Sequence, residues 1–166
     1  MPRLNARVVV SDAGPLISLA RLNMLGLLTD LFAEVQVPRE VLNECLVVPE
    51  RPSAQRIAEA TVQTRLRVCD AAPFNGPAEL GSGELDPIGR ALAIGAGVLV
   101  DDRAARAFAS RLGLDVMGTL GVLVMARRAG MVPTIAPLID QLRAGGQRLD
   151  HTAVAQALAA AGEGLS

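Results

Sequence analysis

The chain has 166 residues with a formal net charge of −1, and 51% of the residues are hydrophobic although only three are aromatic. A chain of this length fits one domain with a core of aliphatic side chains, and its charge gives no overall support to nucleic-acid binding. All sixteen basic residues are arginines, which excludes mechanisms that need a lysine, such as the phosphate-binding P-loop and Schiff-base chemistry.

Strands and helices are predicted to alternate along the chain. Residues 8–10 are an unbroken β-branched run that favours a buried parallel strand ending at Ser11 and Asp12. Apolar periodicity and the positions of proline and glycine predict helices over 16–22, 38–46, 53–63, 84–94, 103–112, 120–128, 135–143 and 152–160, with a further apolar segment over 24–32. Further strands are predicted over 34–37, 66–69, 97–100 and 114–117.

This alternation implies an α/β fold, a three-layer sandwich in which helices cover both faces of a central parallel sheet. Between the predicted strand over 66–69 and the helix over 84–94, residues 70–83 are rich in Gly, Pro and Ala and are the best candidate for a mobile loop.

Histidine and cysteine are too scarce to build a site. His151 is the only histidine, and Cys45 and Cys69 are too few and too isolated for a disulfide framework or a zinc site. The longest apolar runs reach about half the length of a membrane span, and no basic segment precedes an apolar one at the N-terminus. We therefore expect a cytoplasmic protein that does not interact with membranes and whose chemistry depends on carboxylates.

Acidic residues follow two of the predicted buried strands. Asp12 ends the first, and Asp101 and Asp102 end the strand over 97–100. Ligands of open parallel sheets bind beyond the carboxyl ends of the strands, so these side chains should share one edge. Taken singly, each aspartate is explained at least as well as a cap of the following helix.

Two glutamates are predicted to face halfway inward on helices near the same edge. With 100° per residue, Glu44 lies about 60° from the apolar Val41 and Glu84 about 40° from the apolar Ile88. Border glutamates of this kind are common on amphipathic helices, so either one alone indicates little. Four acids that converge on one edge of the sheet are harder to explain without a common binding site.

Gathered carboxylates need a compensating charge. Two of them ~4 Å apart repel by about 4 kcal/mol at an effective dielectric constant near 20. A divalent cation removes this repulsion, and oxygen ligands without neighbouring cysteine or histidine favour Mg²⁺ or Mn²⁺ over zinc. Because such an ion polarises a phosphoryl oxygen and keeps bound waters, the pattern favours hydrolysis of a phosphodiester.

Five motifs carry a family resemblance, in an order and spacing that cover most of the chain. They are VVSDAGPLI at 9–17, VPREVLNE at 37–44, GE at 83–84 with ALA at 91–93, VLVDDR at 98–103 with Arg106, and GTLGVL at 118–123. Together they resemble the PIN-domain superfamily, in particular the PIN-like branch grouped with VapC-type toxins of prokaryotic toxin–antitoxin systems.

The resemblance implies a Mg²⁺- or Mn²⁺-dependent endoribonuclease. It implies catalytic roles for Asp12, Glu44, Glu84 and Asp102. Asp12, Glu84 and Asp102 would hold the metal ion, and the adjacent Asp101 is a candidate ligand that the sequence does not separate from Asp102.

Basic and hydroxyl side chains flank these acids. Arg103 and Arg106 could hold the phosphates of RNA, although a solvated helix face explains them equally well. Many relatives carry a hydroxyl residue just after the first aspartate, where this chain has Ala13 and Gly14. A supporting hydrogen bond would therefore have to come from Ser11 or Thr119.

The resemblance also implies partners: an RNA substrate, a small cognate antitoxin and a second copy of the chain in a homodimer. Residues 1–145 are expected to form the PIN-like nuclease domain, and 146–166 a C-terminal helical extension packed on it or on a partner. An alternative is a non-catalytic PIN-like module that binds RNA or protein, which the near-neutral charge and the unusual Pro87 and Gly89 favour. A metal-dependent phosphatase for small substrates would use the same acids.

Overall fold

The structure, a computed structural model, describes residues 8–63, 65–72 and 74–164. Its sheet consists of parallel strands in the order β3-β2-β1-β4-β5. The strands are β1 (Val8–Ser11), β2 (Glu34–Pro38), β3 (Arg67–Cys69), β4 (Gly97–Leu99) and β5 (Val116–Met117). Because β2 and β3 lie on one side of β1 and β4 and β5 on the other, the winding reverses between β1 and β4, and this switch point opens a crevice at the carboxyl edge.

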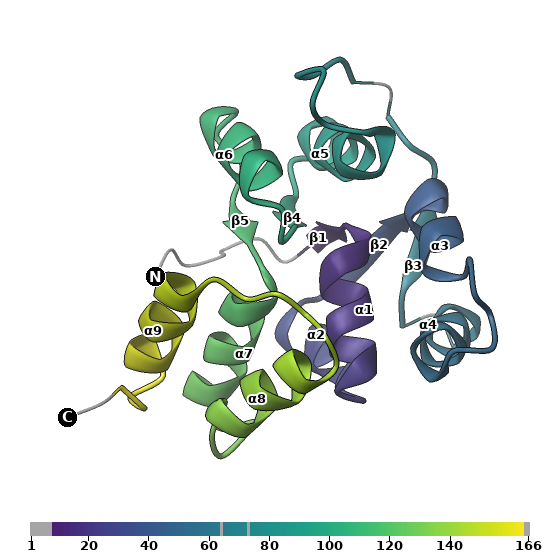
Figure 1. Cartoon of the computed structure of the whole chain (residues 1–166). Helices are drawn as coiled ribbons and strands as arrows, with labels where there is room; N and C mark the ends of the chain where they lie inside the picture. Colours follow the sequence, from purple (N-terminus) through teal and green to yellow (C-terminus); the bar gives the residue numbers. More distant parts are fainter. Residues whose placement is uncertain (1–7, 64, 73, 165–166) are drawn as a thin grey trace.

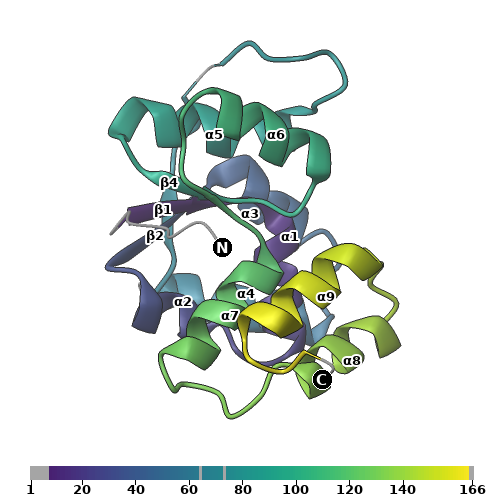
Figure 2. The same cartoon turned by 90° about the vertical axis from the view of Figure 1, so that its left-hand side faces the viewer.

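Helices cover both faces of the sheet (Figures 1 and 2). One face is covered by α5 (Ser82–Ile94) and α6 (Arg103–Arg111). The other helices of the described residues are α1 (Ala13–Arg21), α2 (Gly26–Leu31), α3 (Arg39–Cys45), α4 (Pro52–Val62), α7 (Thr119–Arg128), α8 (Ala136–Ala144) and α9 (His151–Ala160). They contribute to the core on the opposite face, and α3 contacts both α1 and α5. The predicted three-layer α/β sandwich is confirmed.

The strand period of two divides the core between the two faces. Val9 belongs to the larger apolar cluster, which α1 and α7 cover, whereas its neighbour Val10 belongs to the cluster under α5 and α6. Both side chains are fully buried, as expected for a parallel strand with helices on both sides.

Two helices begin two or more residues earlier than the sequence pattern predicts. α1 begins at Ala13 rather than Leu16, so that Pro15 lies in its first turn, where no backbone donor is lost. α5 begins at Ser82 rather than Glu84, which places Pro87 inside the helix beyond the first turn. Since proline has no N–H, it cannot donate to the carbonyl oxygen of Gly83 four residues earlier.

Gly89 is explained by the segment that precedes α5. A Cβ atom at this position would lie 2.6 Å from the carbonyl oxygen of Ala72 and 2.7 Å from the Cβ atom of Phe74. The ring of Phe74 in turn lies 5.9 Å from that of Phe108 on α6, measured between centroids. The glycine, which weakens a helix, thus allows the connection between β3 and α5 to pack closely on that helix.

The C-terminal region belongs to the same core. Val154, Ala157 and Ala161, from α9 and just beyond it, are buried in the larger apolar cluster, and α9 packs against α7. The Glu163 carboxylate accepts hydrogen bonds from the backbone N–H groups of Ile135 and Ala136 at the start of α8. Within the described ranges, no helix has both the length and the apolar character that a bilayer crossing requires.

Candidate active site

Asp12 lies at the switch point of the sheet. It follows β1 and precedes α1, its backbone N–H donates to the carbonyl oxygen of Leu99 on β4 at 2.9 Å, and only 9% of its surface is exposed. The hydroxyl of Ser11 donates to the carbonyl oxygen of Asp12 at 2.9 Å. Ser11 therefore supports the backbone of this residue, and its hydrogen bond does not reach the carboxylate.

Neighbouring aspartates after β4 have different surroundings. Both Asp101 oxygens accept hydrogen bonds from Thr119 at the start of α7: Oδ1 from the backbone N–H at 2.6 Å and Oδ2 from the hydroxyl at 2.7 Å. Asp102 is exposed, and its carboxylate caps α6 by accepting from the backbone N–H of Ala105 at 2.9 Å. The structure thus separates two side chains that the sequence leaves equivalent.

Glycines allow the Asp101 carboxylate to lie close to the backbone on two sides. A Cβ atom at Gly14 would lie 3.1 Å from Asp101 Oδ2, and one at Gly118 would lie 2.8 Å from Asp101 Oδ1. Neither glycine has a predicted role in holding an acid. For Gly118 a signal was present, because it directly precedes Thr119 and follows a short strand.

Two glutamates approach the same edge from helices on either side. Glu44 is exposed on α3, and its Oε2 lies 3.1 Å from the position that a Cβ atom of Gly83 on α5 would occupy. Glu84 is half-buried in the first turn of α5, where its Oε2 accepts a hydrogen bond from the backbone N–H of Gly81 at 2.7 Å. In this arrangement Glu84 caps its own helix.

Electrostatics show which acids surround Asp12. The pKa of the Asp12 carboxyl is raised from 3.8 to about 7, mainly by burial. The Ala13 N–H opposes this rise, and the charges of Glu44, Glu84 and Asp101 add to it. Glu44, Glu84 and Asp101 are therefore close enough for their charges to act on the Asp12 carboxyl. The Asp102 carboxylate is exposed and caps α6.

The oxygen atoms of these acids are the ligands that a hard cation prefers, but the side chains are not gathered into a metal-binding group. Among residues 8–63, 65–72 and 74–164, no three acidic, histidine or cysteine side chains form a group that could hold a metal ion. Glu84 is bonded to Gly81 and both oxygens of Asp101 are bonded to Thr119. The oxygen donors and the buried carboxyl of Asp12 fit Mg²⁺ or Mn²⁺, provided that Glu84 releases the N–H group that it now caps.

A groove of about 780 Å³ begins at Asp101 and runs along the C-terminal helices. Its first wall contains Asp101, Arg103, Arg106 and Thr119. The opposite wall is formed by the connection between α8 and α9 and by α9 itself. Arg103 and Arg106 are both exposed, so the groove joins the predicted phosphate-binding residues to the acidic edge.

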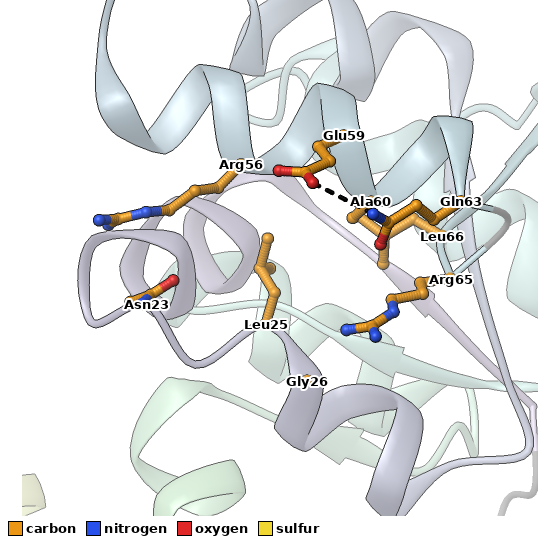
Figure 3. A pocket seen from close by; sticks show the side chains of 9 residues that line it. All are labelled: Asn23, Leu25, Gly26, Arg56, Glu59, Ala60, Gln63, Arg65 and Leu66. Atoms are coloured by element: carbon orange, nitrogen blue, oxygen red, sulfur yellow. Dashed lines mark hydrogen bonds between the residues drawn. The ribbon is translucent and has the colours of Figure 1, made fainter.

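A second cavity, of about 420 Å³, lies beside the residues that precede β3. Figure 3 shows the side chains that line it. Its lining comes from the turn between α1 and α2, from α4 and from the residues before β3: Asn23, Leu25, Gly26, Arg56, Glu59, Ala60, Gln63, Arg65 and Leu66. None of the carboxylates around Asp12 lines this cavity, so it takes no part in the candidate site.

Comparisons with known proteins agree with this geometry. Residues 8–163 match a family model described as "DUF3368: PIN domain". The chain resembles the structure of a PilT N-terminus domain protein from the hyperthermophilic archaeon Sulfolobus solfataricus P2, with a TM-score of 0.55 and 13% identity over 72% of this chain and 92% of that one. At this level of identity the likeness shows the fold.

A domain of a functionally unknown protein from Methanocaldococcus jannaschii DSM 2661 has a TM-score of 0.46 and 14% identity, over 68% of this chain and 91% of that one. No curated protein matches the chain.

Proposed function

Because the chain belongs to the PIN-domain family, whose members are typically nucleases, we propose that it is an endoribonuclease that hydrolyses RNA phosphodiesters with Mg²⁺ or Mn²⁺. The observation that carries the proposal is the buried carboxyl of Asp12 at the switch point, with its pKa raised to about 7 and three further acids nearby. A buried carboxylate among like charges is stabilised by a cation, and a phosphodiester needs such a cation beside the acids to approach them.

We propose the following division of roles. Asp12 and Asp101 would hold the cation, and Thr119 keeps the Asp101 carboxylate in place through its two hydrogen bonds. Glu84, once free of Gly81, completes the binding or accepts a proton from the attacking water at its carboxylate. A bound divalent cation supplies charge neutralisation and polarises the phosphoryl oxygen. Glu44 supports the site from α3.

This division changes one assignment made from the sequence. The resemblance implies Asp102 as metal ligand and catalytic residue, with Asp101 as an adjacent candidate. Two observations favour Asp101 as the ligand. The Asp102 carboxylate accepts a hydrogen bond from Ala105, and the Asp101 carboxylate lies beside Gly14 and Gly118. In this proposal Asp102 acts as the N-cap of α6.

A toxin role is proposed on the sequence resemblance to the VapC-type branch. In that role the protein would act on RNA in the cytoplasm, form a homodimer and be inhibited by a small cognate antitoxin. Residues 1–145 would be the nuclease domain and 146–166 its C-terminal extension. Isolation of a small protein that copurifies with the chain, followed by RNA cleavage assays with and without that protein, would test the inhibition.

The ribonuclease proposal is tested by cleavage of RNA with Mn²⁺ or Mg²⁺. Wild type should cleave, and Asp12→Asn should lose activity by roughly 100-fold or more, because it removes a charged ligand without changing the shape of the side chain. Thermal melting of both proteins without metal is the control for folding. Equal cleavage by wild type and Asp12→Asn would show that the proposed mechanism is wrong.

A non-catalytic PIN-like module is the second candidate, and the absence of a formed metal group in the described residues favours it. Isothermal titration with Mn²⁺ separates the two functions. A nuclease should bind Mn²⁺ in wild type and lose the binding in Asp12→Asn. A module that binds RNA or protein without turnover should give no heat with Mn²⁺ in either protein.

A further inference from the structure

The Glu84 carboxylate caps the helix that carries it. Its Oε2 accepts a hydrogen bond from the backbone N–H of Gly81 at 2.7 Å, at the start of α5. This N–H is one of the donors that the start of a helix leaves without a partner inside the helix. The charge of Glu84 also acts on the Asp12 carboxyl. The same carboxylate therefore caps α5 and lies near the site around Asp12.

The capped position of Glu84 is not a metal-binding position. Among the residues that the structure describes, no three acidic, histidine or cysteine side chains form a group that could hold a metal ion. Asp101 is fixed by two hydrogen bonds from Thr119, and Asp12 is buried at the switch point. Glu84 is half-buried, and within the described residues its carboxylate is held by the bond from Gly81 alone. Of the three proposed ligands, Glu84 is thus the one that has to move when a metal-binding group forms.

The backbone around Gly81 does not depend on this bond. The carbonyl oxygen of Gly81 accepts from the backbone N–H groups of Glu84 at 3.1 Å and Leu85 at 3.0 Å. Leu80, directly before Gly81, is buried in the apolar cluster under α5 and α6, and its own N–H donates to the carbonyl oxygen of Pro77 at 3.0 Å. The Glu84 side chain can therefore leave Gly81 without unwinding α5, and the N–H group stays in place to bind the carboxylate again.

We propose that the hydrogen bond from Gly81 to Glu84 controls the metal affinity of the site: the carboxylate leaves the N–H group when a divalent cation binds, and the loss of this bond keeps the affinity low. The inference rests on the proposed function, in which Glu84 completes the cation site, and extends it to the control of cation binding. Because capping and cation binding compete for one carboxylate, each weakens the other by the same factor. A hydrogen bond to a charged group is stronger than a neutral one, so this factor should be roughly tenfold.

The exchange of single backbone N–H groups with water tests the release in the wild-type chain. NMR measures these rates without metal and with saturating Mg²⁺, which is diamagnetic. The Gly81 N–H should exchange roughly tenfold faster with Mg²⁺, because it loses its acceptor. The N–H groups of Ala105 and Ala153 donate to the capping carboxylates of Asp102 and Asp150, both at 2.9 Å. They are the matched controls and should keep their rates.

Two substitutions of Gly81 test the effect of the bond on affinity. The φ angle of this residue is −80°, which proline and alanine both adopt. Gly81→Pro removes the N–H, so Glu84 has no bond to give up and Mn²⁺ should bind roughly tenfold more tightly in titration calorimetry. Gly81→Ala keeps the N–H, and its Cβ atom would lie 3.5 Å from Glu84 Oε2, an ordinary contact, so this variant should bind Mn²⁺ like wild type. Thermal melting checks that both variants fold.

The outcomes separate this inference from the proposed function. If N–H groups near Asp12 respond to Mg²⁺ but the exchange rate of Gly81 does not change, the inference is wrong and the cation site stands. If the Gly81 N–H is released but wild type never cleaves RNA, the inference stands and the ribonuclease fails. If no N–H group responds to Mg²⁺, both are wrong. A folded Gly81→Pro with unchanged Mn²⁺ affinity would also contradict the inference, and if Gly81→Pro does not fold, the wild-type exchange rates decide.

Discussion

Thr119 donates two hydrogen bonds to Asp101, one to each carboxylate oxygen, at 2.6 Å and 2.7 Å. Thr119 is buried at the start of α7, and Asp101 is half-buried after β4. The contact joins the two strand ends on one side of the switch point, and it holds the Asp101 carboxylate beside Gly14 and Gly118. Several expected results depend on it.

Removing the hydroxyl of Thr119 should impair the site with little change in its shape. Thr119→Val leaves Asp101 Oδ2 without its donor, and we expect activity to fall roughly tenfold and the free energy of unfolding to fall by about 1–2 kcal/mol. Thr119→Ser keeps the donor and should retain most of the activity. RNA cleavage and urea denaturation measure the two effects, and a fully active Thr119→Val would show that this hydrogen bond does not orient a functional group.

The two adjacent aspartates should differ in function. Asp101→Asn removes a charge that acts on the Asp12 carboxyl and should abolish Mn²⁺ binding and cleavage. Asp102→Asn keeps an N-cap residue on α6 and should remain active, so it serves as the matched control. Titration calorimetry with Mn²⁺ and cleavage assays on both variants check this, and the opposite order of losses would return the ligand role to Asp102.

Stability should depend on pH through Asp12. Its pKa is raised from 3.8 to about 7 in the folded protein, so between these values the folded state binds more protons than the unfolded state. The free energy of unfolding without metal therefore falls as the pH rises through this window, by about 4 kcal/mol at most at 1.36 kcal/mol per pKa unit.

Asp12→Asn, which cannot ionise, should remove this fall and be the more stable protein at pH 8 without metal. Mn²⁺ should stabilise wild type more than Asp12→Asn at that pH. Urea denaturation from pH 4 to pH 8, with EDTA or Mn²⁺, measures both effects. A wild-type stability that does not change over this range would contradict the pKa shift.

A methyl group at Gly118 should disturb Asp101 sterically. The φ angle of Gly118 is −103°, which alanine adopts readily, yet its Cβ atom would lie 2.8 Å from Asp101 Oδ1 and 3.3 Å from the carbonyl oxygen of Val100. Gly118→Ala should therefore lose most activity. Gly26→Ala, at which a Cβ atom meets nothing within 4 Å, is the control and should behave like wild type in cleavage and melting assays.

The hydrogen bonds of Glu163 should contribute stability without affecting the chemistry. Its carboxylate caps the start of α8 through Ile135 and Ala136, so Glu163→Ala should lower the free energy of unfolding by roughly 1–2 kcal/mol. Glu50→Ala, at an exposed residue that makes no ion pair with another described residue, should have no measurable effect. Loss of cleavage in a folded Glu163→Ala would instead connect the C-terminal region to the site.

Most of the fold and part of the site could be predicted from sequence. The β-branched run before Asp12 and the apolar periodicity of the helices are local signals, and the parallel sheet follows from their alternation. The position of Asp12 at the end of a strand could be predicted from the same local signals. Thr119 was identified as a possible hydrogen-bond donor, although its partner, Asp101, is 18 residues away in the chain.

Residue periodicity was enough to specify the layered architecture, because it decides which side chains each strand and helix buries. The composition also excluded lysine-dependent chemistry and left carboxylates as the reactive groups. Contacts between segments distant in the chain were needed to distinguish the two adjacent aspartates. Asp102 accepts a hydrogen bond from Ala105 three residues ahead, whereas Asp101 accepts both of its bonds from Thr119, 18 residues away.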